Sequence, residues 1–129
     1  MDIENRLEKI EFHLKLIGEV INHMDYPVES LVLGLNWSSD DLDKAHDIFE
    51  KFYIQLEENK APKLLHIALE TDFEKELGVD YQTVKLIVLA FFRNQQWVEV
   101  CEAYAKSFGN SPPMEVQEII RNLRSSMLD

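Results

Sequence analysis

Cysteine, glycine and proline are scarce in this sequence, and each shortage narrows the possible folds. The single cysteine, Cys101, rules out an internal disulfide and favours a reducing compartment, so we expect a cytoplasmic protein. Only four glycines and four prolines occur, a composition typical of helical rather than β-rich or disordered chains. A length of 129 residues corresponds to one domain, and we predict a single all-α domain over residues 1–129.

Long apolar runs and positive charges are also in short supply. No apolar run approaches the roughly 18 residues of a membrane span, and the acidic start MDIENRLEKIE differs from a secretory signal. The net charge of −11 argues against unaided binding to nucleic acids or anionic membranes, because it repels phosphates. Acidic residues concentrate between residues 40 and 58. We interpret this segment as a solvated helix face, with a surface for a basic protein partner as the alternative.

The chain begins with an unbroken heptad pattern. Its apolar residues recur at alternating gaps of four and three residues: Ile3, Leu7, Ile10, Leu14, Ile17, Ile21 and Met24. In heptad lettering Leu7, Leu14 and Ile21 occupy position a, and the others occupy position d. This spacing predicts a long helix from Ile3 to Met24 whose stripe faces another helix. A second stripe begins halfway along, on a different side of the helix: Phe12, Leu16 and Val20.

We interpret the heptad stripe as an association surface and expect a homodimer. The predicted interface consists of six residues: Ile3, Arg6, Leu7, Ile10, Leu14 and Ile17. Arg6, Lys9 and Glu11 would set the orientation of the helices. The alternative is that the stripe packs wholly within its own chain, as in many helical bundles. Besides a second copy, we expect an unidentified protein partner, bound by a coiled coil or by a helix in a groove.

The rest of the chain predicts a series of shorter helices. Their expected ranges are 27–33, 40–59, 63–77 (one helix or two short ones), 81–94, 97–108 and a last helix opened by Pro112 and Pro113. Gly34 and Gly78 are expected to end the helices before them, and Asp80 is expected to cap the helix after it. We therefore predict a compact bundle of five to six helices, with the long heptad-patterned helix at its N-terminus.

Residues 73–92 resemble a helix-turn-helix, which provides an alternative function. The segment FEKELGVDYQTVKLI has a glycine at its turn, and a second helix that would carry Gln82, Lys85 and Arg93 toward nucleic acid. Two features argue against DNA binding. Glu74 occupies a position that usually holds a small residue, and Lys85 and Arg93 are the only cations on the would-be recognition helix. A DNA-binding transcriptional regulator is therefore the less favoured interpretation.

The sequence contains no pattern that indicates an enzyme, a metal or a cofactor. No Ser-His-Asp set, phosphate-binding glycine loop or Cys-x-x-Cys motif is recognisable. Asp43 and His46 have the spacing of a carboxylate–histidine metal motif, but no second helix repeats it, so we expect His46 to pack at the edge of the core. Cys101 lies between acidic neighbours and is expected to be buried and inert.

Three segments resemble a family of small uncharacterised helical proteins of spore-forming bacteria and their phages, typified by YhaI. They are MDIENRLEKIEFHLKLI, MDYPVESLVLGLNWSSDDL and LGVDYQTVKLIVLAFFRNQQWVEVCEAY, which include the pair Tyr26-Pro27. The resemblance covers residues 1–108, and residues 109–129 look like a C-terminal helical extension. It implies an all-helical fold and a cytosolic setting, it is compatible with a phage or prophage origin, and no catalytic residue can be carried over from it. Together with the heptad stripe, it leads us to expect a non-enzymatic regulatory or adaptor protein.

Overall fold

The computed structural model describes residues 2–22 and 24–128, and every regular element within them is helical. The elements are α1 (Ile3–Val20), α2 (Pro27–Leu35), α3 (Ser39–Glu57), α4 (Leu65–Leu77), α5 (Tyr81–Arg93), α6 (Val98–Lys106), the short 3-10 helix η1 (Met114–Val116) and α7 (Gln117–Leu128). The predicted all-α fold is confirmed. The described residues form seven α-helices and one 3-10 helix, more α-helices than the five to six that we predicted.

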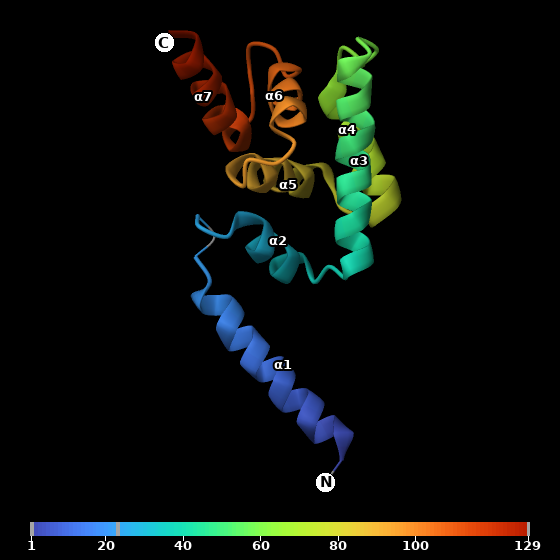
Figure 1. Ribbon diagram of the computed structural model, residues 1–129, viewed down its shortest axis with the longest axis vertical. Coiled ribbons are helices and arrows are strands. Elements are labelled where there is room, and N and C mark those ends of the chain that lie inside the picture. Colours follow the sequence, from blue (N-terminus) through green and yellow to red (C-terminus); the bar gives the residue numbers. More distant parts are fainter. Residues whose placement is uncertain (1, 23, 129) are drawn as a thin grey trace.

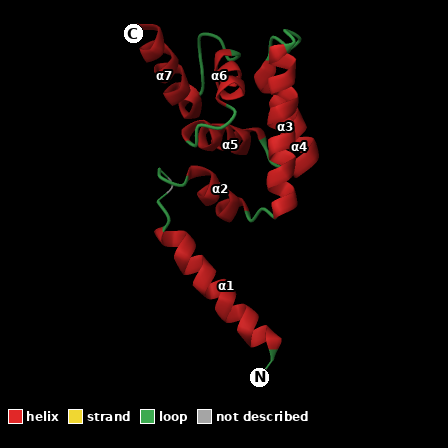
Figure 2. Ribbon diagram, in the orientation of Figure 1, coloured by secondary structure: helices red, strands yellow, loops and turns green. Residues whose placement is uncertain are grey.

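Helices α2 to α7 pack into a compact body, and α1 projects away from it (Figures 1 and 2). In the body, α3 and α4 lie side by side, while α5 lies between α2 on one side and α6 and α7 on the other. The N-terminus lies at one end of the molecule and α7 at the other. The long N-terminal helix was expected to be part of the bundle, but no residue of α1 is buried.

An aromatic cluster forms the centre of the body. The ring of Phe49 on α3 lies 5.6 Å from that of Phe73 on α4 and 4.9 Å from that of Phe91 on α5. Trp97, which precedes α6, stacks on the Phe49 ring at 6.3 Å. Helix α5 is central, as predicted from its nearly continuous apolar surface, because its side chains supply a large share of the fully buried residues.

Several helix ends follow local sequence signals. The side chain of Ser38 accepts the Asp41 amide while Asp41 accepts the Ser38 amide, a capping box that starts α3. Asp80 accepts the Thr83 amide at 2.8 Å and starts α5, as predicted. Gly78 ends α4 with φ of 65°, a left-handed conformation that glycine adopts without strain.

Other helix ends differ from the predictions. Gly34 does not end α2: the helix continues to Leu35, and Asn36 adopts the left-handed conformation instead, with φ of 57°. Asparagine tolerates this conformation better than most residues do. Helix α1 stops at Val20 rather than Met24, because Ile21 is extended. The last helix does not open at the two prolines, since the Val116 amide bonds to the Pro113 carbonyl and forms a 3-10 turn before α7.

We predict that Phe49→Ala destabilises the body severely. Phe49 is fully buried within the aromatic cluster, and removal of such a ring leaves a cavity that costs about 3–5 kcal/mol. The matched control is Leu86→Ala on α5, where the side chain is 51% exposed and the expected change is within about 0.5 kcal/mol. Urea unfolding of the two variants measures both values. Equal stabilities would contradict the description of this core.

Candidate functional site

The heptad stripe of α1 lies open to solvent. Its first five members are each at least half exposed: Ile3 73%, Leu7 50%, Ile10 52%, Leu14 54% and Ile17 54%. Single exposed apolar residues are common on soluble proteins, but a continuous row of large ones marks an interaction site. The alternative that the stripe packs within its own chain is therefore wrong for the described residues. The second stripe, Phe12, Leu16 and Val20, is exposed as well.

The sequence around α1 explains why the helix leaves the body. Asp2 caps its start by accepting the Asn5 amide at 2.8 Å. After Val20 the chain extends at Ile21, and the carbonyl of Asn22 accepts the amides of Asp25 and Tyr26 in a tight turn. Pro27 then fixes the first residue of α2. These constraints direct α1 away from α3 to α7 and leave only α2 beside its end.

A groove of about 850 Å³ runs between α1 and α2. Its walls are Glu11, Leu14, Lys15, Gly18, Glu19 and Ile21 of the N-terminal segment and Ser30, Leu33, Gly34 and Asn36 of the α2 segment. A Cβ atom on Gly18 would lie 3.7 Å from Cδ1 of Leu33, so α1 approaches α2 at this glycine. Leu14 and Ile21 belong to both the stripe and the groove, which makes the two features one continuous surface.

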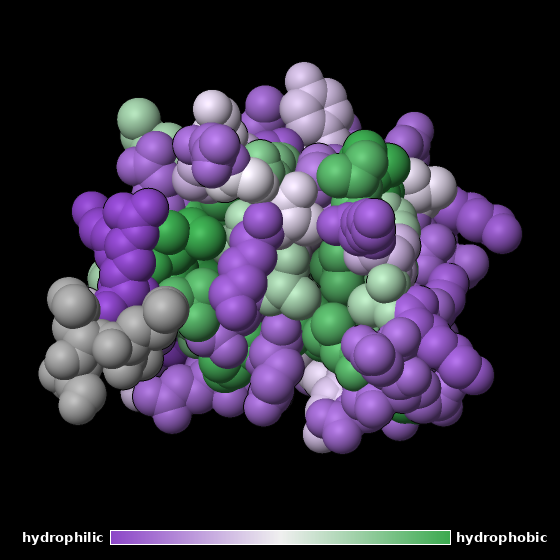
Figure 3. All heavy atoms as spheres, turned by 90° about the horizontal axis from the view of Figure 1, so that it is seen from above, coloured by the Kyte–Doolittle hydropathy of each residue, from purple (hydrophilic) through white to green (hydrophobic). Residues whose placement is uncertain are grey.

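The face of the body seen in Figure 3 differs from α1 in the distribution of its apolar side chains. Hydrophilic side chains cover much of this face and divide the apolar side chains into separate patches (Figure 3). The view is from the end of the molecule that carries α7. The continuous apolar row on α1 therefore lies on the opposite side of the molecule from this mixed surface.

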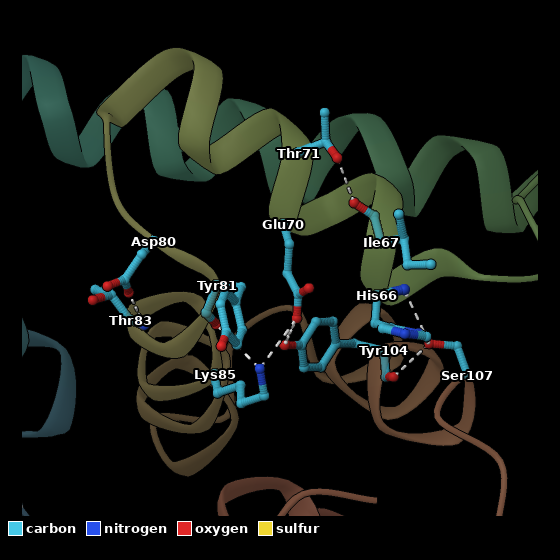
Figure 4. A network of polar contacts seen from close by, with 10 residues as sticks. All are labelled: His66, Ile67, Glu70, Thr71, Asp80, Tyr81, Thr83, Lys85, Tyr104 and Ser107. Atoms are coloured by element: carbon cyan, nitrogen blue, oxygen red, sulfur yellow. Dashed lines mark hydrogen bonds and ion pairs between the residues drawn. The ribbon is translucent and has the colours of Figure 1, made fainter.

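A buried polar network joins α4, α5 and α6 (Figure 4). Nζ of Lys85 lies 3.6 Å from Oε2 of Glu70 and 4.5 Å from the ring centre of Tyr81. Tyr104 donates its hydroxyl to the same Glu70 oxygen at 2.6 Å, and burial followed by the Glu70 carboxylate raises the pKa of Tyr104. The Glu70 carboxylate thus compensates the buried charge of Lys85, and its removal would leave that charge without a partner.

The structure also contains a Ser–His pair that sequence reasoning missed, because the two residues lie 41 positions apart. Ser107 donates its hydroxyl proton to the Tyr104 carbonyl at 2.7 Å and accepts the His66 amide at 3.0 Å. Nδ1 of His66 lies 2.7 Å from the same hydroxyl oxygen, and the tautomer of the ring sets which of the two groups donates. The pair ties α4 to the end of α6.

The residues proposed for DNA contact do not form a basic surface. Gln82 is exposed, but Lys85 is only 5% exposed and its charge faces Glu70. The expectation that Lys85 is exposed is wrong, because its position on α5 faces α4 and α6. Arg93 forms a two-pronged ion pair with Glu118 of α7, with Nη2 2.8 Å and Nε 3.1 Å from its carboxylate oxygens. Both cations of α5 are thus engaged within the chain, which does not favour phosphate binding.

His46 and Cys101 have the structural roles that we predicted. Nδ1 of His46 accepts the indole N–H of Trp97 at 3.0 Å, and the His46 ring meets the edge of Phe91. Cys101 is fully buried, and burial raises the pKa of its thiol. Among the residues that the structure describes, no three His, Cys, Asp or Glu side chains are grouped as a metal site requires.

Each helix in residues 2–22 and 24–128 is too short or too polar to cross a bilayer.

The sequence of this chain matches a known protein family over most of its length. Residues 1–108, which include α1 to α6 and the α1–α2 groove, match the sequence profile of a family described as "Protein of unknown function (DUF1878)". The chain belongs to the DUF1878 family. No curated protein and no solved structure matches the chain. Residues 109–129 lie outside the family match, yet Val116 and Ile119 are fully buried, so the extension completes the core.

We predict that His66→Gln reduces the loss of stability caused by mild acid. Burial lowers the pKa of His66 below its ordinary value of 6.5 in the folded chain. The neutral ring therefore contributes stability that is present above pH 6.5 and is lost as the pH falls below that value. Urea unfolding at pH 7.5 and pH 5.5 should show a smaller decrease for His66→Gln than for the wild type. His13→Gln on exposed α1 is the control, and equal decreases for all three proteins would contradict the assignment.

Proposed function

We propose that this chain is a non-enzymatic regulatory or adaptor protein that acts by helix-mediated protein–protein interaction and by self-association through α1. The observation that carries the proposal is the exposed stripe, whose first five members are at least half exposed on a helix with no buried residue. The predicted interface residues Ile3, Leu7, Ile10, Leu14 and Ile17 all lie in this row. Arg6 lies beside it and is exposed.

The stability of α1 supports association. Most of the stability of a helix in a protein comes from the packing of its apolar face, and α1 has no buried residue. Covering a half-exposed leucine or isoleucine contributes roughly 1 kcal/mol, half of the value for complete burial. Five such side chains on each copy therefore favour association by several kcal/mol, before the entropy of association is subtracted. This gain is available only when a partner covers the stripe.

The partners that we propose are a second copy of the chain, in a homodimer, and a further protein that is not yet identified. The α1–α2 groove is open on one side and has apolar and charged walls, as a site for a partner helix would need. We propose no catalytic function, because the resemblance described above supplies no catalytic residue. A cytoplasmic setting and a phage or prophage origin are further parts of the proposal, which rest on the single cysteine and on the resemblance described above.

We predict that the double variant Leu7→Asp, Leu14→Asp yields a folded monomer. Two carboxylates in the stripe remove the apolar contact and repel each other across the interface. Light scattering should show the mass of one chain, and circular dichroism should show that the helices of the body remain. In contrast, the wild type should elute as an oligomer at the same concentration.

The matched control is the double variant Asn5→Asp, Leu16→Asp. Both positions are exposed on the side of α1 away from the heptad stripe, and the variant adds the same two charges. It should retain the oligomeric mass of the wild type. A wild type that is monomeric at millimolar concentration, or a Leu7→Asp, Leu14→Asp variant that remains oligomeric, would overturn the proposal.

A further inference from the structure

We infer that the copies associate through α1 in parallel and in register, with Arg6 of each copy facing Glu11 of its neighbour. This inference rests on the proposed function, since it specifies how the exposed stripe of one chain meets that of a second copy. The stripe alone does not define an orientation, because an apolar row can pack against a partner helix that runs in either direction. The residues that flank it carry the directional information.

The two flanks of the stripe differ in charge and size. One flank, position e of the heptads, holds Glu4, Glu11 and Gly18, and the other flank, position g, holds Arg6, His13 and Val20. The four charged or ionisable members are all exposed. Just outside the flanks the charges are mixed, since Lys9 lies beside the g flank and both Glu8 and Lys15 lie beside the e flank. The contrast is therefore confined to the flanks themselves, where two carboxylates lie on one side of the apolar row and Arg6 lies on the other.

A parallel arrangement places opposite charges together. In a parallel coiled coil, position g of one helix faces the e position five residues later on its neighbour. Arg6 then meets Glu11, once on each side of a symmetric pair. In an antiparallel arrangement e faces e and g faces g, so that Glu11 would meet Glu4 and Arg6 would meet His13. Exposed ion pairs contribute only about 0.2–1 kcal/mol each, but the apolar contact is similar in both orientations and the flanks therefore decide between them.

The second pair of facing positions lies at the α1–α2 groove. The same five-residue offset places His13 of one copy opposite Gly18 of the other. Gly18 has no side chain and opens into the α1–α2 groove of about 850 Å³, beside Leu14 and Leu33. The side chain of Leu33 in the same chain lies 3.7 Å from the place that a Cβ atom on Gly18 would take, so α2 already covers part of this site. The parallel arrangement thus places His13 of the neighbouring copy at the rim of the groove.

Other coverings of the stripe are less compatible with the structure. Helix α7, the other terminal helix, lies at the opposite end of the molecule from the start of α1 (Figure 1). Leucine at a with isoleucine at d, as at Leu7, Leu14, Ile3 and Ile10, also occurs in parallel bundles of three or four helices, so the pairing of the flanks must not depend on the number of copies. Neighbouring helices in any parallel bundle meet through the same e and g flanks, so the Arg6–Glu11 pairing holds for two copies or more.

Charge-reversal variants distinguish the two orientations, because the parallel and the antiparallel arrangement predict opposite changes in the association constant. We predict that Arg6→Glu and Glu11→Arg each weaken self-association about threefold to tenfold at low salt, because each brings like charges together. The double variant Arg6→Glu, Glu11→Arg should return to within about twofold of the wild type. In an antiparallel assembly Glu11→Arg would instead strengthen association, because the new cation would face Glu4, and that result would overturn the inference. Analytical ultracentrifugation measures the association constants, and Glu8→Arg outside the flanks is the control of equal charge change.

Cross-linking provides an independent measurement. Ile3→Cys places a thiol at a d position near the start of α1, where two parallel copies meet within disulfide distance. In an antiparallel pair the two thiols would lie near opposite ends of a helix about 27 Å long. Cys101 is fully buried and does not compete. We predict rapid intermolecular disulfide formation in Ile3→Cys under air, as seen on non-reducing gels, and none in wild type.

The two proposals fail in different ways. If the chain associates but Ile3→Cys does not cross-link, the parallel arrangement is wrong and the proposed function stands. A protein that remains monomeric in the ultracentrifuge, with or without the charge reversals, would remove both. A stripe that a different protein covers would give a wild type that is monomeric when pure and oligomeric only in a mixture, which also overturns this inference.

Discussion

The apolar row of α1 is exposed to water, and its burial against another surface is the constraint on which the rest of the structure depends. Helices α2 to α7 form a shared core around the Phe49 cluster without any contribution from α1, although single apolar side chains such as Ile54 and Ile67 remain exposed on the body. The turn after Val20 holds α1 outside that body. Most of the stability of a helix in a protein comes from the packing of its apolar face, and burial against another chain is the physical source of stability that remains.

The body acts as a rigid support for the projecting helix. The aromatic rings of α3, α4 and α5 interlock, and Trp97 is fixed both by stacking on Phe49 and by its hydrogen bond to His46. The Glu70–Lys85–Tyr104 network ties α4, α5 and α6 together with charges that are balanced inside the fold. Because α2 packs on α5 and approaches α1 at Gly18, the position of the groove is coupled to this core.

Signals within one turn of the chain were predicted well, and contacts between distant residues were not. The Asp80 cap, the Gly78 terminator and the heptad row depend on neighbouring residues, so their consequences can be worked out from the sequence. The end of α2 was assigned to Gly34 because glycine is the commoner left-handed residue, yet Asn36 fills that role. The burial of Lys85 depends on Glu70, which lies on a different helix, and the His66–Ser107 pair also joins two helices. Signals from neighbouring residues therefore predict neither of them.

Hydrogen exchange of the α1 amides as a function of protein concentration tests the central claim most directly. If α1 depends on a second copy, its amides should exchange rapidly in dilute solution and become protected as the concentration rises, while the amides of α3 and α5 remain protected throughout. Protection of α1 equal to that of α5 in the most dilute sample would contradict the account, because the stripe would then be covered by its own chain. Rapid exchange of α1 at every concentration would contradict it as well.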